Sequence, residues 1–165
     1  MKEFLKRTIA PVAGQLFFSR PANRKSFDDL RGNLEASNQH IKERFVTVDA
    51  ALEENQPSAQ LTAKLRHIIA IEAWGQSRLM VFLGDTFKQD ENYPYAPDKE
   101  LSWTELKESF AETRAKTIEI IRRLETEENV TTETVHHNDF GPFTAKAWLQ
   151  YLQMHGNNEA KGLKA

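Results

Sequence analysis

Two polar side chains near the end of the sequence have the spacing of a metal-binding pair. His155 and Glu159 are four residues apart, so on a helix they lie one turn apart on the same face, where an imidazole and a carboxylate can converge on one cation. His155 also shares a helical direction with Trp148 and Leu152, which favours a partly buried ring. The pair alone is equally typical of a core histidine bonded to a neighbour or of a plain helix-surface pair.

A third ligand could come from His67, which shares a helix face with Ile71 and Trp74. The sequence contains no cysteine, so any metal must be held by nitrogen and oxygen. The resulting hypothesis is a metal site built from His67, His155 and Glu159. Three protein ligands would leave a position open for water or substrate.

Five further residues are candidates for the surroundings of such a site. Glu72 falls within an apolar stripe, where it is either a buried partner of an arginine or a helix end, or a carboxylate that orients a ligand histidine. Asn38 fills a polar gap in another stripe, where it either satisfies a buried group or lines a cavity. We interpret three aromatic residues as parts of the core or of a cavity wall: Trp74, Trp148 and Tyr151.

Two adjacent histidines, His136 and His137, lie in a polar, threonine-rich segment at 126–143. We interpret both as solvated loop residues, in a loop that could overhang the site. The segment itself predicts an irregular crossing or a short extended piece.

These residues would be positioned by four amphipathic helices. Apolar residues recur at spacings of three and four, and N-cap residues and stop signals predict helices at 27–52, 58–83, 102–124 and from 144 past Gly156. Gly156 is expected to loosen the turn between His155 and Glu159. The fold class is therefore all-α, a four-helix bundle with long connections between helices 2 and 3 and between helices 3 and 4. Residues 1–25 form an N-terminal extension and residues 26–165 one domain.

Composition restricts the partners. The hydrophobic content of 39%, charged content of 28% and net charge of −2 are ordinary for a globular protein and argue against nucleic-acid binding. No apolar run is long enough to cross a membrane, and the charged N-terminus is unlike a signal peptide. We expect a cytoplasmic protein.

Two stretches resemble the DinB-like (YfiT-like) metalloenzyme family of four-helix bundles. Residues 65–74, LRHIIAIEAW, are similar to that family's second helix, in which a ligand histidine is followed five residues later by an acid and then by an aromatic residue. Residues 140–151, FGPFTAKAWLQY, leading to His155, are similar to its last helix. With the helix order and the chain length, the resemblance covers most of the sequence from about Phe27.

The resemblance implies a divalent metal, zinc or nickel, held by one histidine of the second helix and by a His-x-x-x-His pair of the last. The first two ligands correspond to His67 and His155. Glu159 stands where the family has its third histidine. Two histidines and one carboxylate also suit iron or manganese. If the replacement of the third histidine by Glu159 has abolished metal binding, the protein has no cofactor.

Two functions follow from the resemblance. One is a divalent-metal-dependent enzyme acting on a small-molecule substrate, either a transferase that uses a low-molecular-weight thiol or a hydrolase. The alternative is a non-catalytic binding or scaffold protein that has lost a competent metal site. A homodimer is expected in either case, because Phe17, Phe18 and the segment Tyr93 to Tyr95 add more apolar surface than one core needs.

Overall fold

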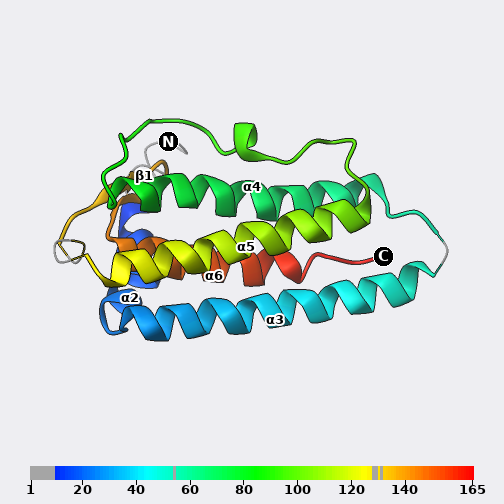
Figure 1. Ribbon diagram of the computed structural model, residues 1–165, viewed down its shortest axis with the longest axis horizontal. Coiled ribbons are helices and arrows are strands. Elements are labelled where there is room, and N and C mark those ends of the chain that lie inside the picture. The colour runs from blue at the N-terminus through cyan, green and yellow to red at the C-terminus, as the bar shows by residue number, and fades with distance from the viewer. Residues whose placement is uncertain (1–9, 54, 128–129, 131) are drawn as a thin grey trace.

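Four long helices lie side by side and form the body of the molecule (Figure 1). The computed structural model describes residues 10–53, 55–127, 130 and 132–165. The helices are α3 (Phe27–Leu52), α4 (Ala59–Val81), α5 (Trp103–Glu125) and α6 (Ala145–Ala160). Both α5 and α6 pack against α3 and against α4. The predicted all-α four-helix bundle is confirmed, with its long connections between α4 and α5 and between α5 and α6.

Each long helix begins at a hydroxyl side chain that caps its first turn. The four N-caps are Ser26, Ser58, Ser102 and Thr144, and each accepts a hydrogen bond from a backbone N–H in the first turn. Ser26 with Asp29 and Ser102 with Glu105 form complete capping boxes. These local contacts satisfy donors that a helix end leaves unpaired, which is why the starts were predictable from sequence.

Two glycines allow α6 to approach its neighbours closely. A Cβ atom at Gly75 of α4 would lie 2.5 Å from Leu152 Cδ2 of α6, and one at Gly156 would lie 3.3 Å from the Arg114 guanidinium. Helix α6 continues through Gly156 to Ala160, so the expected loosening of that turn was wrong. Packing against three helices offsets the low helix propensity of glycine.

An ion pair is buried at the centre of the bundle. Arg114 of α5 and Glu72 of α4 are 1% and 3% exposed, and Arg114 Nη2 donates to Glu72 Oε2 at 2.8 Å. Nε lies 2.8 Å from Oε1 without the alignment of a hydrogen bond, and Nη1 donates to the carbonyl of Leu34 in α3 at 3.0 Å. Thr117 donates to Glu72 at 2.7 Å. The charges therefore offset each other's desolvation and join three helices.

The two long connections lie against α4 and α6. The chain from α4 to α5 runs along α4 and contains the short 3-10 helix η2 (Tyr93–Tyr95) (Figure 1). The chain from α5 to α6 contains an antiparallel hairpin of β1 (Val135–His137) and β2 (Gly141–Phe143), in which Val135 pairs with Phe143. Sequence reasoning expected no strand pair there. Residues 128, 129 and 131 of this connection lie outside the described residues.

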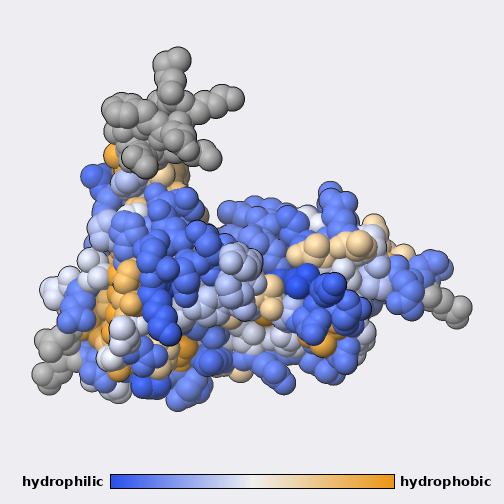
Figure 2. Space-filling view, turned by 90° about the horizontal axis from the view of Figure 1, so that it is seen from above, coloured by the Kyte–Doolittle hydropathy of each residue, from blue (hydrophilic) through white to orange (hydrophobic). Residues whose placement is uncertain are grey.

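The N-terminal segment packs on the bundle as far as it is described. Residues 15–23 form η1 (Gln15–Ser19) and α2 (Arg20–Asn23), which contact α6. Phe18 packs against the rings of Phe140, Phe143 and Tyr151. Residues 1–9 of the expected extension lie outside the described residues. The face seen from above is largely hydrophilic (Figure 2), and no helix among the described residues has the length and apolar character needed to cross a membrane.

Removing one member of the buried ion pair should leave the other charge buried without a partner. Glu72→Gln is expected to lower the free energy of unfolding by about 3–5 kcal/mol. The matched control is Glu119→Gln, which breaks the exposed pair with Arg122 and should cost less than about 1 kcal/mol. Urea unfolding measures both. Equal, small losses in the two variants would contradict the structural role of Glu72.

Candidate metal centre

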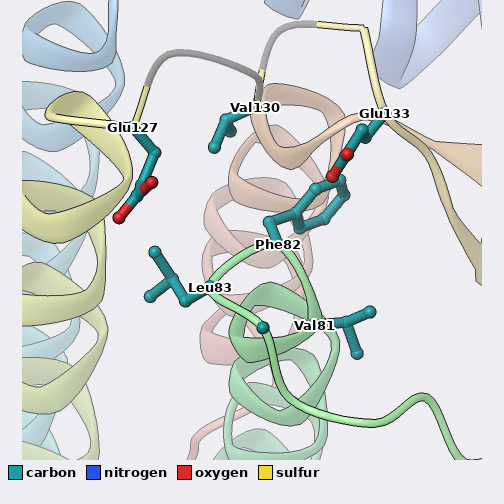
Figure 3. A pocket seen from close by; sticks show the side chains of 7 residues that line it. Val81, Phe82, Leu83, Glu127, Val130 and Glu133 are labelled. Atoms are coloured by element: carbon teal, nitrogen blue, oxygen red, sulfur yellow. The ribbon is translucent and has the colours of Figure 1, made fainter.

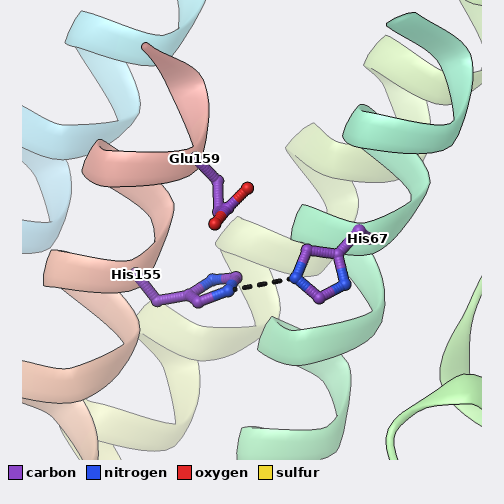
Figure 4. A group of neighbouring side chains, drawn as sticks. All are labelled: His67, His155 and Glu159. Atoms are coloured by element: carbon purple, nitrogen blue, oxygen red, sulfur yellow. Dashed lines mark hydrogen bonds between the residues drawn. The ribbon is translucent and has the colours of Figure 1, made fainter. Parts of the chain in front are cut away.

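The three predicted ligands lie together on the seam between α4 and α6 (Figure 4). His67 Nε2 and His155 Nε2 are 3.3 Å apart, although the residues are 88 positions apart in sequence. One nitrogen from each histidine and one Glu159 oxygen all lie within 4.8 Å of one another. His67 is exposed, whereas His155 and Glu159 are half-buried. The group is therefore open to solvent on the α4 side.

The donor types and the spacing of the two histidine nitrogens fit a divalent metal of the zinc class. The Glu159 oxygen, within 4.8 Å of these nitrogens, would approach more closely to coordinate the same ion. Two ligand atoms at about 2.0–2.1 Å from a tetrahedral ion lie about 3.3 Å from each other. The separation of the two histidine nitrogens has this value. Two imidazoles and a carboxylate also form a set that zinc, nickel, iron and manganese accept. These residues would hold the ion with at least one position left for another ligand.

The electrostatics of His155 keep its imidazole neutral. Burial, with a smaller contribution from the neighbouring His67, lowers the pKa of His155 from 6.5 to about 4. At neutral pH the ring consequently has a free nitrogen lone pair, which metal coordination requires. The present contact between the two histidine rings is one in which one nitrogen donates and the other accepts.

Glu159 has a competing partner in Lys64 of α4. Lys64 Nζ donates to Glu159 Oε2 at 2.6 Å, and both side chains are about one third exposed. This hydrogen bond, together with the charge of Lys64, lowers the pKa of the Glu159 carboxyl despite its partial burial. The carboxylate is therefore ionised and able to bind a cation. Its second oxygen has no other partner in the part of the chain that the structure describes.

The histidine pair opens into a cavity of about 530 Å³. Helix α4 contributes His67, Ile71 and Trp74, and α6 contributes Tyr151 and His155. The connection from α4 to α5 and the hairpin complete the wall. Their residues are Gln89, Glu91, Asn92, His137, Asn138 and Asp139. The cavity thus combines two histidines at one end with an aromatic wall and a polar rim, as small-molecule sites commonly do.

Three of the surrounding residues proposed from sequence do not line this cavity. Glu72 lies in the interior with Arg114, as one of its two interpretations stated. Asn38 of α3 has a buried Oδ1 without a hydrogen-bond partner among the described residues. Trp148 is fully buried behind the wall, where its indole N–H donates to the carbonyl of Val135. Trp74 and Tyr151 do line the cavity.

His137 was placed wrongly by sequence reasoning. Instead of lying in a solvated loop it is 2% exposed, in strand β1, with its ring against Trp74, Trp148 and Tyr151. His136, the residue before it on the same strand, is exposed as expected. Alternation along a strand separates the two side chains. The burial of His137 could have been predicted only together with the hairpin, in which Val135 pairs with Phe143 and Gly141 has a φ of 80°.

An acidic residue that sequence reasoning passed over holds the loop wall in place. The carboxylate of Asp90 accepts hydrogen bonds from Trp74 Nε1, Arg78 Nη2 and the Tyr95 hydroxyl. Asn138 of the hairpin donates to the Asp90 carbonyl at 2.9 Å. Burial opposes ionisation, but the bonds from Tyr95 and Arg78 prevail and lower the pKa of Asp90. Asp90 therefore ties both connections to α4 beside the cavity.

Another cavity, of about 410 Å³, lies between the C-terminal end of α4 and the segment that follows α5 (Figure 3). Apolar side chains line it together with two carboxylates, Glu127 and Glu133. Among its described lining residues there is no histidine and no cation. It lacks the mixed nitrogen and oxygen donors of the α4–α6 site, so the histidine cavity is the candidate functional site.

The fold and site define a helical-bundle protein with a histidine and carboxylate centre between its second and fourth long helices. The family model described as the DinB superfamily matches residues 61–158, more than half of the chain. The chain therefore belongs to the DinB superfamily. The matched range contains His67 and His155 and ends just before Glu159. No curated protein and no solved structure matches the chain.

The buried His137 should make stability depend on pH. Burial lowers its pKa from 6.5 to about 3 in the folded protein, so between these values the unfolded chain binds an extra proton. The free energy of unfolding should fall as the pH falls through this window, by up to about 1.4 kcal/mol per pH unit from this residue. Above pH 6.5 the contribution is constant.

Urea unfolding at pH 7.5 and pH 5 isolates the effect of His137. His137→Asn should lose about 2 kcal/mol less than the wild type between the two pH values, because it has no imidazole to protonate. His136→Asn, which alters the exposed neighbour, is the control and should keep the wild-type pH dependence. An identical dependence in all three proteins would show that His137 does not control it.

Proposed function

We propose that this chain is a divalent-metal-dependent enzyme acting on a small molecule, with His67, His155 and Glu159 as its metal ligands. The observation that carries the proposal is the 3.3 Å approach of two histidine nitrogens beside an ionised carboxylate, at the edge of a 530 Å³ cavity. Membership of the DinB superfamily supports it. Zinc or nickel is the preferred ion, with iron or manganese as further candidates.

The chemistry would be that of a Lewis acid in a partly enclosed cavity. A bound divalent ion would polarise a carbonyl group or lower the pKa of a water or thiol at its open position. The protein supplies two imidazoles, of which that of His155 is neutral, together with a carboxylate and an aromatic wall. A transferase that uses a low-molecular-weight thiol, or a related hydrolase, is the reaction class that the family resemblance favours.

One observation favours a second function, that of a non-catalytic binding or scaffold protein. Glu159 is paired with Lys64 and the two histidines contact each other, so the three side chains satisfy one another without a metal. A polar trio that is purely structural would have this arrangement. The two functions differ in whether a divalent ion displaces these internal contacts.

Metal analysis of protein purified without a histidine tag, followed by titration with Zn²⁺ and Ni²⁺, tests the ligand set. Glu159→Gln should weaken binding by about 10–100-fold, because the amide keeps the shape and loses the charge. Glu159→His should keep or raise the affinity, since imidazole suits both ions. His155→Ala should be the weakest, because it removes a ligand and leaves a gap beside Leu152.

Lys64→Met provides a control of opposite sign. It removes the competitor for the Glu159 carboxylate and keeps the length of the side chain, so metal affinity should rise by up to about fivefold. A wild-type protein that binds no divalent ion above background would refute the enzyme proposal. If Glu159→Gln then also has an unchanged Tm with and without metal, the trio is structural.

We also propose that the protein is a homodimer, formed through the apolar surface of its N-terminal segment. Val12, Leu16 and Phe17 are 57%, 45% and 59% exposed, whereas Phe18 packs inward and does not contribute. Tyr93 in η2 is also exposed, at 75%. Large apolar side chains exposed together in one short segment are typical of a surface that a second copy covers.

Light scattering coupled to size-exclusion chromatography tests this assembly at micromolar concentrations. The wild type should have the mass of a dimer, and Phe17→Asp should shift it to the monomer, because a charge would be buried in the interface. The control is Val46→Asp, at a 69% exposed position in α3, which should leave the mass unchanged. Monomer alone for the wild type would contradict the proposal.

A further inference from the structure

His137 is the most buried polar side chain that lines the candidate cavity. Its ring is 2% exposed and is surrounded by five aromatic rings at centroid distances of 4.6–5.2 Å. Tyr151 joins it to the metal end, because the Tyr151 ring lies 4.6 Å from the ring of His137 and 5.8 Å from that of His155. The two histidines therefore lie at different parts of one wall.

The hydrogen bonds of the ring determine which nitrogen carries its proton. Nδ1 accepts from the backbone N–H groups of Asp139 at 3.1 Å and Phe140 at 3.3 Å. A nitrogen that accepts has no hydrogen, so a neutral ring must carry its proton on Nε2. Because burial lowers the pKa of His137 to about 3, the ring is neutral at physiological pH. His137 is thus a fixed donor through Nε2–H.

This donor has no partner among the described residues. Nε2 is buried, and no atom of the described residues accepts its hydrogen. An unpaired buried donor is costly, and buried polar groups in proteins nearly always have partners. The surrounding aromatic faces offer only weak N–H···π contacts. His137 is one of the residues that line the cavity, so an acceptor that completes its bonding would enter from the cavity and displace the side chains that now cover Nε2.

We infer that His137 is a ligand-binding residue, which donates Nε2–H to the carbonyl oxygen of a small molecule whose other end reaches His67 and His155. A neutral carbonyl, such as that of an amide, is favoured over a second anionic group, because the rim carries the carboxylates of Glu91 and Asp139. The position of the other end rests on the proposed function. The donor role of His137 rests on its own geometry.

Matched pairs of small acids measure this contact on the zinc-loaded protein. N-acetylglycine, N-acetyl-β-alanine and N-acetyl-γ-aminobutyrate each have a carboxylate and an amide, and pentanoate, hexanoate and heptanoate have the same lengths without the amide. For at least one pair, the Kd of the wild type for the N-acetyl acid should be lower than its Kd for the alkanoate of the same length by roughly fivefold or more. Calorimetric titration gives the Kd of each acid.

Two substitutions separate the donor from the structural role of the ring. His137→Asn places an acceptor near the position of Nδ1, which preserves the bonds to Asp139 and Phe140, and removes the donor; the preference for the amide should vanish. His137→Gln places an amide N–H near the position of Nε2 and should retain part of the preference. His136→Asn should behave as the wild type. A preference that is unchanged in His137→Asn would overturn the inference.

Nitrogen-15 NMR of the histidine side chains gives a readout that needs no metal. In the metal-free protein the ring of His137 should be the Nε2–H tautomer, and its Nε2 signal should shift when the preferred N-acetyl acid is added. The Nδ1–H tautomer, or no shift at saturating acid, would overturn the inference. Failure of zinc to bind, with the Nε2 shift present, would refute the metal proposal and leave the donor role supported.

Discussion

The buried contact between Arg114 and Glu72 is the constraint on which the arrangement of the bundle depends. Two opposite charges in the interior are tolerated only if each has a nearly complete set of partners, and these come from α3, α4 and α5. The fourth helix lies close to the pair as well, because a Cβ atom at Gly156 would come within 3.3 Å of the guanidinium, a tight contact. A single pair of charges therefore joins three of the long helices and lies against the fourth.

The location of the candidate centre follows from this packing. Gly75 of α4 receives Leu152 of α6, three residues before His155, and this close approach brings His155 to α4. The imidazoles then meet at 3.3 Å on the solvent side of the seam. Farther along the same seam, the cavity is closed by two connections that Asp90 ties to α4. Rigid helices thus carry the ligands, and loops carry the rim.

The polar groups around the cavity are held in defined protonation states by different physical causes. Burial lowers the pKa values of His137 and His155 and keeps both rings neutral, whereas a hydrogen bond from Lys64 keeps Glu159 ionised. The centre consequently offers the lone pair of a neutral His155 and the negative charge of Glu159 to a cation. Lys64 already donates a hydrogen bond to one oxygen of the Glu159 carboxylate, so the centre can be stable with or without a metal. This balance between internal pairing and coordination distinguishes the two proposed functions.

The sequence by itself determined the features that depend on local contacts. Helix starts at Ser26 and Ser102 and the shared face of His155 and Glu159 follow from spacings of three and four residues, which need no knowledge of the rest of the chain. His67 was proposed as the third ligand from its helix face and from the resemblance of residues 65–74 to the family's second helix, but its approach to His155, 88 residues away, is a property of the fold.

Contacts between distant segments decided the rest. Glu72 had two interpretations until the fold brought Arg114, which is 42 residues away, to its carboxylate. His137 follows a polar, threonine-rich stretch that resembles a solvated loop, yet a two-stranded hairpin turns its ring into an aromatic core while His136 faces the solvent. Burial, and with it the protonation state of a side chain, is a property of everything packed around the residue, and therefore only the tertiary structure could establish it.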